Sequence, residues 1–210
     1  METVLTYTTL YNNPWQRSQI TFPYVTWDNG FTDEELKAII DYCDASGTEF
    51  GTTFGSKSEE ETSQHRVSNV KFHGRNDETA WIFDKLNFII QAANEQFYNF
   101  HLNGYAQFQY TTYDPNGRYD WHTDMSFGEK FGNDAEPRKL SLTLLLNDDN
   151  DDFEGGEFQI NNGKQETPIT VDMFKGRVVL FPSFMIHRVK PVTKGVRKSL
   201  VVWVLGPKFV

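Results

Sequence analysis

The amino-acid sequence predicts a mainly β (α+β) protein, in which N-terminal helices precede a closed or double-sheet β architecture such as a jelly roll. Three observations support this class. Apolar residues recur at helical spacing before residue 104, they alternate after it, and turn-forming residues divide the second part into short segments. Since no repeat or linker interrupts the 210 residues, we expect one domain (1–210), with a helical support region (1–103) and a β core (104–206).

Two helices are expected in the first region. Thr32 can cap a helix, and Glu35 stands three positions later, as in a capping box. An apolar stripe then continues through Leu36, Ile39 and Cys43. A second helix is predicted over 78–100, and its apolar stripe is interpreted as a face packed on a sheet rather than a surface for a partner.

The remaining N-terminal segments carry weaker signals. Short edge strands are expected at 3–11 and 21–27. The stretch 46–64 is rich in Gly, Ser, Thr and Glu, which predicts a mobile loop. Further along, the acidic run 148–152 could bind a hard cation, but its spacing matches no known loop motif, and we interpret it as a solvated turn.

Eight strands are predicted after residue 104, because short alternating segments are separated by turn sequences such as Asp-Pro-Asn-Gly at 114–117. No helical pattern interrupts them, which favours two packed sheets or a closed barrel. The predicted strands are 105–113, 118–124, 139–147, 156–160, 168–171, 176–181, 186–189 and 197–205.

Composition excludes several classes of function. The formal net charge of −9 argues against binding to nucleic-acid phosphates. The single cysteine, Cys43, permits neither an internal disulfide nor a Cys-rich zinc site, and we expect a buried thiol. No apolar run reaches the length of a membrane span, and no signal-peptide pattern is visible. We therefore expect a soluble cytoplasmic protein with no nucleic-acid or membrane partner.

The tripeptide His122-Thr123-Asp124 is the main candidate for a metal site. In an extended segment, residues two apart project from the same face, so this imidazole and carboxylate can converge. Two histidines and one carboxylate form the facial triad that holds Fe(II) and leaves three positions open. The tripeptide alone could arise by chance. His187 is the candidate third ligand, although by itself it would also fit a hydrogen-bonded core histidine.

A candidate anion site begins the last predicted strand. Strand alternation places Arg197 and Ser199 on one face, together with Val201 and Trp203. A guanidinium offers a two-pronged donor to a carboxylate, and a serine hydroxyl can add a hydrogen bond. This arrangement would suit the distal carboxylate of 2-oxoglutarate. A surface arginine at the end of a strand is the alternative.

Six motifs follow one another in fixed order: Tyr113-x5-Tyr119-x2-His122-x-Asp124, Arg138-Lys139-Leu140-Ser141-Leu142-Thr143-Leu144-Leu145-Leu146-Asn147, Glu154-Gly155-Gly156-Glu157-Phe158, Leu180-Phe181-Pro182-Ser183, His187-Arg188-Val189-x-Pro191-Val192 and Gly195-x-Arg197-x-Ser199-Leu200-x-x-Trp203. In order, spacing and residue type they resemble the prolyl-hydroxylase (prolyl 4-hydroxylase-like) branch of the Fe(II)/2-oxoglutarate-dependent oxygenases. The resemblance covers about residues 78–205, and the stretch 66–70 also looks like an upstream segment of such hydroxylases.

The resemblance implies a double-stranded β-helix core with the N-terminal helices packed on one sheet. The metal ligands would be His122, Asp124 and His187, with no catalytic residue beyond them. Arg197 would pair with the distal carboxylate of 2-oxoglutarate, together with Tyr113 and Ser199. The pocket lining would include Trp203, Tyr119 and Trp121, and with Phe181 the two tryptophans would form a hydrophobic sleeve. Gly155 and Gly156 would serve close backbone approach or a bulge.

Two departures limit the comparison with particular relatives. Leu144-Leu145 stands where some relatives have a tyrosine that contacts the cosubstrate, and Arg197 stands where many hydroxylases of the collagen type use lysine. Both leave the expected cofactors in place.

The activity implied is Fe(II)- and 2-oxoglutarate-dependent hydroxylation of a C–H bond, with succinate and CO₂ as coproducts and ascorbate as the expected reductant. A peptidyl-proline in a protein or peptide is the first substrate expected. A free amino acid or other small molecule is the alternative within this chemistry. From another class, a non-catalytic metal-binding β-sandwich, with zinc as a structural ion, would also fit the metal ligands. The segments 125–137 and 46–64 are expected to be flaps over the substrate.

Overall fold

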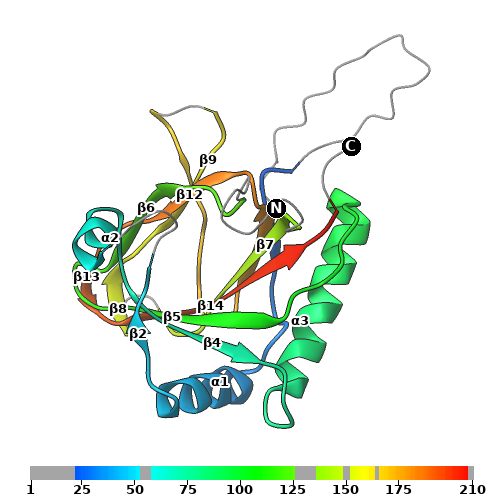
Figure 1. The fold of residues 1–210 in the computed structure, drawn as a ribbon, viewed down its shortest axis with the longest axis horizontal. Coiled ribbons are helices and arrows are strands. Elements are labelled where there is room, and N and C mark those ends of the chain that lie inside the picture. Colours follow the sequence, from blue (N-terminus) through cyan, green and yellow to red (C-terminus); the bar gives the residue numbers. More distant parts are fainter. Residues whose placement is uncertain (1–21, 53–57, 126–135, 149–151, 164–165, 208–210) are drawn as a thin grey trace.

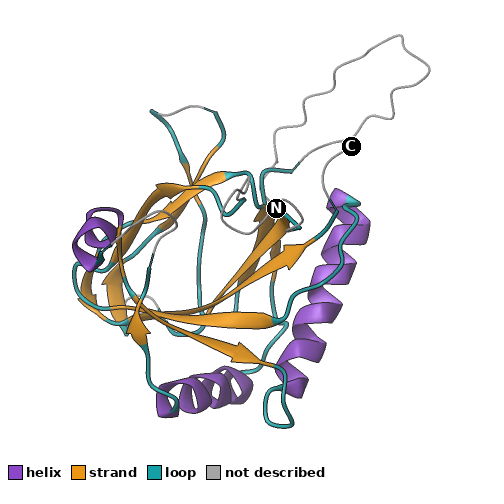
Figure 2. Cartoon of the chain, in the orientation of Figure 1, coloured by secondary structure: helices purple, strands orange, loops and turns teal. Residues whose placement is uncertain are grey.

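The computed structural model describes residues 22–52, 58–125, 136–148, 152–163 and 166–207. Within these residues, two antiparallel sheets face each other and the longer helices lie outside them (Figures 1 and 2). The mainly β (α+β) class and the jelly-roll core predicted from the sequence are therefore confirmed.

The larger sheet has seven strands in the described residues. They are β1 (Val25–Trp27), β2 (Glu49–Phe50), β4 (Asn69–Gly74), β5 (Gln107–Tyr113), β7 (Arg138–Leu145), β11 (Val178–Pro182) and β14 (Arg197–Leu205). Their order across the sheet is β1-β11-β7-β14-β5-β4-β2, so β7 and β14 lie at its centre.

The smaller sheet has five strands, and a separate ribbon has two. The five are β3 (Arg66–Val67), β6 (Arg118–His122), β9 (Phe158–Asn161), β10 (Ile169–Thr170) and β12 (Ile186–Val189), in the order β10-β9-β12-β6-β3. The ribbon pairs β8 (Phe153–Gly155) with β13 (Val192–Gly195).

Helices α1 (Asp33–Ala45) and α3 (Ala80–Ala93) cover the outer face of the larger sheet (Figure 1). A π-helical turn, η1 (Asn94–Tyr98), continues α3 and ends where Asn99 adopts a positive φ of 52°. A third helix, α2 (Glu59–His65), lies beside β6, where Arg118 Nη2 donates to the Ser63 carbonyl at 2.9 Å. The two predicted helices are thus present, and they pack on one sheet as expected.

Alternation along the two central strands gives the larger sheet two different faces. Every second residue of β7 and β14 packs under the helices, in a core that includes Leu140, Leu142, Leu144, Leu200, Val202 and Val204. The residues between them point into the space between the sheets, where Ser141, Thr143, Ser199, Val201 and Trp203 lie. Because alternation is a property of extended chain, one pair of strands supplies both the apolar core and a polar interior.

All eight strands predicted after residue 104 are present, with bounds that differ by at most two residues. The predicted edge strand at 21–27 corresponds to β1, which does lie at the edge of the larger sheet. The strand predicted at 3–11 lies outside the described residues. The region before residue 104 contributes strands β1 to β4 as well as helices.

The interpretation of 46–64 as a loop is wrong for most of its described part, which contains β2 and the start of α2. Neither element carries an apolar pattern: β2 has two residues, and in α2 only Thr62 is buried. Residues 53–57 and 126–135 lie outside the described residues, so the expected flaps stay a prediction. In the described parts of the chain, no helix combines the length and apolar character required to cross a membrane.

Candidate metal and cosubstrate site

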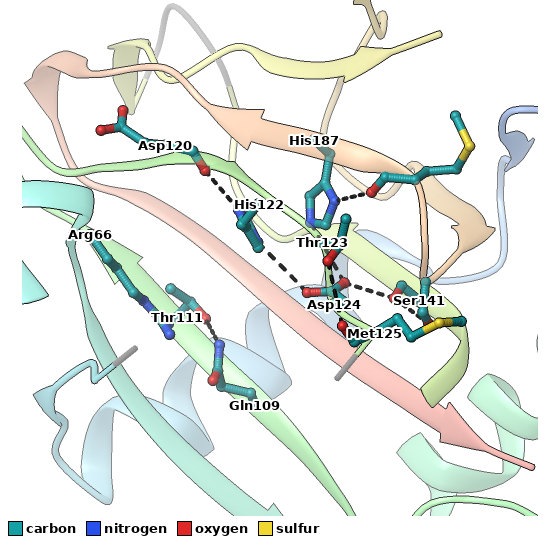
Figure 3. Close-up of polar contacts among 12 residues, drawn as sticks. Arg66, Gln109, Thr111, Asp120, His122, Thr123, Asp124, Met125, Ser141 and His187 are labelled. Carbon is teal, nitrogen blue, oxygen red and sulfur yellow. Dashed lines mark hydrogen bonds and ion pairs between the residues drawn. The ribbon is translucent and has the colours of Figure 1, made fainter. Parts of the chain in front are cut away.

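Three side chains converge between the two sheets at the end of β6. His122 and His187 are register partners on the neighbouring strands β6 and β12, and Asp124 follows β6 directly. Their ligand atoms lie within 4.8 Å of one another (Figure 3). Nε2 of His122 is 3.6 Å from Asp124 Oδ1, and Nε2 of His187 is 3.5 Å from Asp124 Oδ2. Strand pairing therefore brings together the three residues that the sequence singled out.

Both imidazoles are oriented by the backbone. His122 Nδ1 lies 2.7 Å from the carbonyl of Asp120, and His187 Nδ1 lies 2.9 Å from the carbonyl of Met185. A carbonyl oxygen can only accept, so Nδ1 carries the proton in each ring and the lone pair of Nε2 faces the centre. Burial lowers the pKa of His187 to about 4, which keeps this ring neutral near pH 7, as metal binding requires.

The carboxylate of Asp124 is ionised although it is buried. Burial opposes ionisation, but the electrostatic influence of the neighbouring His187 and His122 and the hydrogen bond from Ser141 outweigh it and hold the Asp124 pKa below its usual range. Two neutral imidazole nitrogens and one carboxylate oxygen are ligands suited to Fe(II). Within the described residues this group has three members, which is the number that leaves positions for a cosubstrate and dioxygen. The residues fit a metal centre of this type.

Arg197 is a buried cation without a described counter-charge. Its side chain is 2% exposed, and its Nη1 donates to Ser199 Oγ at 3.2 Å. Its Nη2 is buried with no hydrogen-bond partner, and no described carboxylate lies within ion-pair distance. Because a guanidinium stays charged and an unpaired buried charge is costly, this arrangement fits an anionic ligand held in the pocket.

Tyr113 lies opposite Arg197 on β5, as its register partner. The Arg197 Cζ is 5.6 Å from the centre of the Tyr113 ring. Burial raises the pKa of the Tyr113 phenol, so its hydroxyl keeps its proton and can donate a hydrogen bond. Arg197, Ser199 and Tyr113, which the sequence predicted to bind a carboxylate, therefore line the same pocket as the metal ligands.

A glycine makes room for the arginine. Gly156 has a φ of +67°, and a Cβ at this position would lie 2.8 Å from Arg197 Cδ. At the neighbouring Gly155, a Cβ would lie 2.6 Å from the Pro191 carbonyl oxygen. The expectation that both glycines serve close backbone approach is confirmed.

Comparison with known proteins identifies the family. A family model described as the 2OG-Fe(II) oxygenase superfamily matches residues 108–205, which contain the triad, Tyr113 and Arg197. This match supports a 2OG-Fe(II) oxygenase. A PKHD-type hydroxylase from Crocosphaera subtropica is 28% identical over 86% of this oxygenase chain and 77% of the relative. One from Synechococcus sp. (strain CC9902) is 40% identical over 41% of this chain, and the matched part is 35% of that relative's length.

Solved structures share the fold of this oxygenase. A Pseudomonas putida prolyl-4-hydroxylase aligns with a TM-score of 0.67 and 19% identity, over 89% of this chain and 94% of the other. A prolyl hydroxylase from Trichoplax adhaerens, in complex with a hypoxia inducible factor peptide fragment, aligns with a TM-score of 0.69 and 17% identity, over 88% and 84%. The likeness confirms the double-stranded β-helix with prolyl-hydroxylase-like architecture.

Two of the three predicted lining aromatics of this oxygenase do line its pocket. The Tyr119 ring stacks on His122 with centroids 3.5 Å apart, and burial raises the Tyr119 pKa to about 12. Trp203 also lines the pocket, beneath the Arg138 guanidinium, whose Cζ is 4.0 Å from the ring centre. The prediction for Trp121 is wrong, because neighbours on a strand face opposite ways. Trp121 points away from the pocket, is 36% exposed and packs against Arg188.

Several lining residues were not predicted from the sequence. Arg66 of β3 reaches the pocket, where its guanidinium packs over the Tyr119 ring at 4.8 Å. Gln109 of β5 also lines it and donates to Thr111 Oγ1 at 2.7 Å (Figure 3). Arg66 belongs to the upstream stretch that resembles other hydroxylases, which is the signal that could have placed it. The only sequence signal at Gln109 is the alternation of its strand. Alternation alone does not show whether a residue faces the pocket or the helices.

Proposed function

We propose that the protein is an Fe(II)- and 2-oxoglutarate-dependent dioxygenase that hydroxylates a C–H bond, with a peptidyl-proline as the first substrate to test. The observation that carries the proposal is Arg197, a buried guanidinium without a described counter-charge in the pocket that also holds His122, Asp124 and His187. The pocket combines a three-residue metal site, which leaves coordination positions open, with a buried cation. This combination fits a ligand that chelates metal at one end and carries a carboxylate at the other.

In this proposal the residues have distinct roles. His122, Asp124 and His187 hold Fe(II), and Arg197, assisted by Ser199 and Tyr113, binds the distal carboxylate of 2-oxoglutarate. When bound, iron and 2-oxoglutarate supply the activation of dioxygen, with succinate and CO₂ as coproducts. The chain's own residues orient the cosubstrate and exclude water, and Phe181 and Trp203 contribute apolar surface to the pocket.

The substrate proposal depends on the relatives. The structures that share this fold include prolyl hydroxylases, and one of them is described as a complex with a peptide fragment. A free amino acid or other small molecule is the alternative within the same chemistry. The buried cation argues against a non-catalytic β-sandwich, because such a protein would gain nothing from an unpaired guanidinium. Ascorbate as reductant and a cytoplasmic location stay predictions.

Cosubstrate binding is the first test. Isothermal titration calorimetry without oxygen would measure 2-oxoglutarate binding to the Mn(II)-loaded protein. Arg197→Ala is expected to raise the Kd about 10- to 150-fold, since a hydrogen bond to a charged group contributes about 1.5–3 kcal/mol. Arg75→Ala is the matched control, because Arg75 pairs with Asp84 beside α3, away from the pocket. Equal Kd values for Arg197→Ala and the wild type would refute the role of Arg197.

Turnover is the second test. Purified protein with Fe(II), ascorbate and 2-oxoglutarate is expected to form succinate, and more of it with a proline-containing peptide. His122→Ala should abolish both. Succinate that does not respond to peptides would retain the enzyme class and favour a small-molecule substrate. No turnover, together with no binding of metal or 2-oxoglutarate, would overturn the proposal.

A further inference from the structure

Two serine hydroxyls lie directly behind the candidate metal ligand Asp124. Ser141 of β7 donates from Oγ to Asp124 Oδ2 at 2.7 Å (Figure 3). The Ser183 Oγ, from the turn between β11 and β12, lies 2.9 Å from the Ser141 Oγ. Both serines are fully buried. A buried hydroxyl is costly unless it is hydrogen-bonded, so these two positions need the contacts they make.

The direction of the hydrogen bonds follows from the chemistry of the groups. An ionised carboxylate can only accept, so the single hydroxyl proton of Ser141 points at Asp124. Ser141 can then only accept from Ser183, which must donate its own proton. The result is a chain of two donors, from Ser183 to Ser141 to Asp124, and such chains polarise and strengthen one another.

Ser183 also holds the backbone of the Asp124 segment. Its carbonyl accepts from the Asp124 N–H at 3.0 Å and from the Met125 N–H at 2.9 Å. Its own N–H donates to the Lys139 carbonyl at 3.0 Å. Ser183 therefore connects three segments: β7, the residues after β6 that carry Asp124, and the turn that leads to His187 on β12.

The two carboxylate oxygens of Asp124 have different contacts. Each oxygen faces one imidazole: Oδ1 lies 3.6 Å from His122 Nε2, and Oδ2 lies 3.5 Å from His187 Nε2. Of the two, Oδ2 alone also accepts a serine hydroxyl among the described residues, that of Ser141. A carboxylate that is free to rotate could bind a metal through both oxygens, which would occupy one more coordination position. The proposed reaction needs three open positions, two for 2-oxoglutarate and one for dioxygen.

We propose that Ser141 and Ser183 are positioning residues that engage Oδ2 of Asp124 and leave Oδ1 as its single metal-binding oxygen. The proposal rests on the proposed function, since it presupposes a metal at the triad. Ser141 acts through Asp124, and Ser183 acts through Ser141. Neither serine touches the reacting atoms.

Metal affinity and metal geometry test this directly. Co(II) is the probe, since its visible absorption bands report the number and arrangement of ligands. Ser141→Ala is expected to weaken Co(II) binding about 10- to 100-fold, the usual cost of losing a partner that orients a metal ligand. Its Co(II) spectrum should differ from that of the wild type, because Asp124 can then rotate. Ser141→Thr keeps the hydroxyl and should restore both affinity and spectrum.

The coupling between the serines gives a second readout. Ser183→Ala alone is expected to weaken Co(II) binding less than Ser141→Ala does. In a chain that already carries Ser141→Ala, adding Ser183→Ala should change the Co(II) Kd less than about twofold, because residues in one network are not additive. Fully additive losses would show that Ser183 does not act through Ser141.

A matched control separates positioning from stability. Thr79 is also a fully buried hydroxyl, and it donates to the Gly74 carbonyl at 2.9 Å, away from the triad. Thr79→Val should lower the Tm but leave Co(II) affinity and spectrum unchanged. If Ser141→Ala behaves like Thr79→Val, the positioning role is refuted. If wild type itself binds no Co(II), or His122→Ala binds it equally well, the proposed function fails instead.

Discussion

At the scale of single residues, the site depends on side chains whose surroundings would be unfavourable without a ligand. Arg197 is buried without a described carboxylate beside it, and it contacts Gly156, which has a positive φ. An isolated buried cation destabilises a fold, whereas the glycine adopts this φ without strain. The cost therefore lies in the arginine, and it is consistent with a site shaped for an anion rather than for maximal stability.

Gly156→Ala is expected to weaken 2-oxoglutarate binding. The new Cβ would lie 2.8 Å from Arg197 Cδ and 3.0 Å from Val192 Cγ2, so the arginine must shift. A displaced guanidinium loses its alignment with the carboxylate, and we expect a rise of about tenfold or more in Kd, within the range for hydrogen bonds to charged groups. Titration calorimetry would measure it. Gly47→Ala is the control, because Gly47 also has a positive φ but contacts nothing within 4 Å of its Cβ position. Equal Kd values for Gly156→Ala and the wild type would contradict the packing argument.

The sequence predicted the residues whose chemistry is unusual in their setting. Two patterns can be recognised because each indicates a ligand. One is a histidine and an aspartate two apart on a strand, and the other is an arginine at the start of an apolar strand. Ser141 and Ser183 carry no such signal, since a small polar residue on a strand or after a proline is ordinary. Their role depends on contacts between β7 and the β11–β12 turn, which only the folded chain defines.

At the scale of elements, α1 shows how local sequence sets a boundary. Thr32 and Glu35 form the predicted capping box: the Thr32 N–H donates to Glu35 Oε2 at 2.8 Å, and the Glu35 N–H donates to Thr32 Oγ1 at 3.3 Å. The Glu35 carboxylate also accepts from Lys85 Nζ at 2.7 Å, which connects α1 to α3. The cap thus stabilises both the helix start and the contact between helices.

Thr32→Ala is expected to lower the free energy of unfolding by about 1 kcal/mol, the usual cost of losing an N-cap side chain. For a chain of this size that corresponds to a fall of about 2–4 °C in Tm. The Kd for 2-oxoglutarate should not change, because α1 packs on the face of the larger sheet opposite the pocket. Thermal denaturation and calorimetry would measure both. Thr32→Ser keeps the cap and should behave like wild type, and a shared loss of stability in both variants would argue against capping as the cause.

His73 on β4 predicts a dependence of stability on pH. Its ring stacks on Phe108 with centroids 5.2 Å apart, and burial, with a contribution from Lys71, lowers its pKa below 6.5. Below about pH 6.5 the unfolded chain gains a proton at His73 that the folded chain does not, so stability falls as the pH drops toward the folded-state pKa. Above pH 6.5 His73 is neutral in both states and has no such effect.

The test of this linkage is His73→Phe, which keeps an aromatic ring and removes the titrating group. Chemical denaturation at pH 7.5 and at pH 5.5 is expected to show a smaller loss of stability for the variant than for the wild type. His65→Phe is the control, because His65 is exposed at the end of α2. An unchanged difference between the two pH values in His73→Phe would exclude His73 as a source of the acid sensitivity.

Element length explains much of what could be predicted, although the two-residue strand β10 was also predicted. Strands β5, β7 and β14 have seven to nine residues, and α1 and α3 have thirteen and fourteen, which is enough for a period to be visible. By contrast, β2 and β3 have two residues each and form only because a longer neighbouring strand offers unpaired hydrogen-bonding groups. Helix α2 lacks an apolar stripe, and its sequence resembles that of a polar loop.

At the scale of the whole molecule, the two faces of the larger sheet have different roles, one in stability and the other in the site. Its outer face packs against α1 and α3 in a continuous apolar core, and its inner face supplies Arg197, Ser199, Tyr113 and Ser141. The smaller sheet supplies His122 and His187. The site is therefore assembled from both sheets, and anything that binds there holds the two sheets together.

This arrangement predicts that metal and cosubstrate stabilise the whole fold. A ligand that binds only the folded state, at a concentration 100 times its Kd, adds about 2.7 kcal/mol to the free energy of unfolding. For a chain of this size that raises the Tm by roughly 5–10 °C. Differential scanning fluorimetry with Mn(II) and 2-oxoglutarate, added singly and together, would measure the shift.

Three variants test whether the rise in Tm comes from binding at this site. His122→Ala should lose the shift caused by Mn(II), and Arg197→Ala should keep that shift but lose most of the additional shift caused by 2-oxoglutarate. Thr32→Ala should start from a lower Tm and show the full shift, because its defect lies on the other face of the larger sheet. If His122→Ala and the wild type are stabilised equally, the ligands bind elsewhere on the protein, and the sheets are not held together through this site.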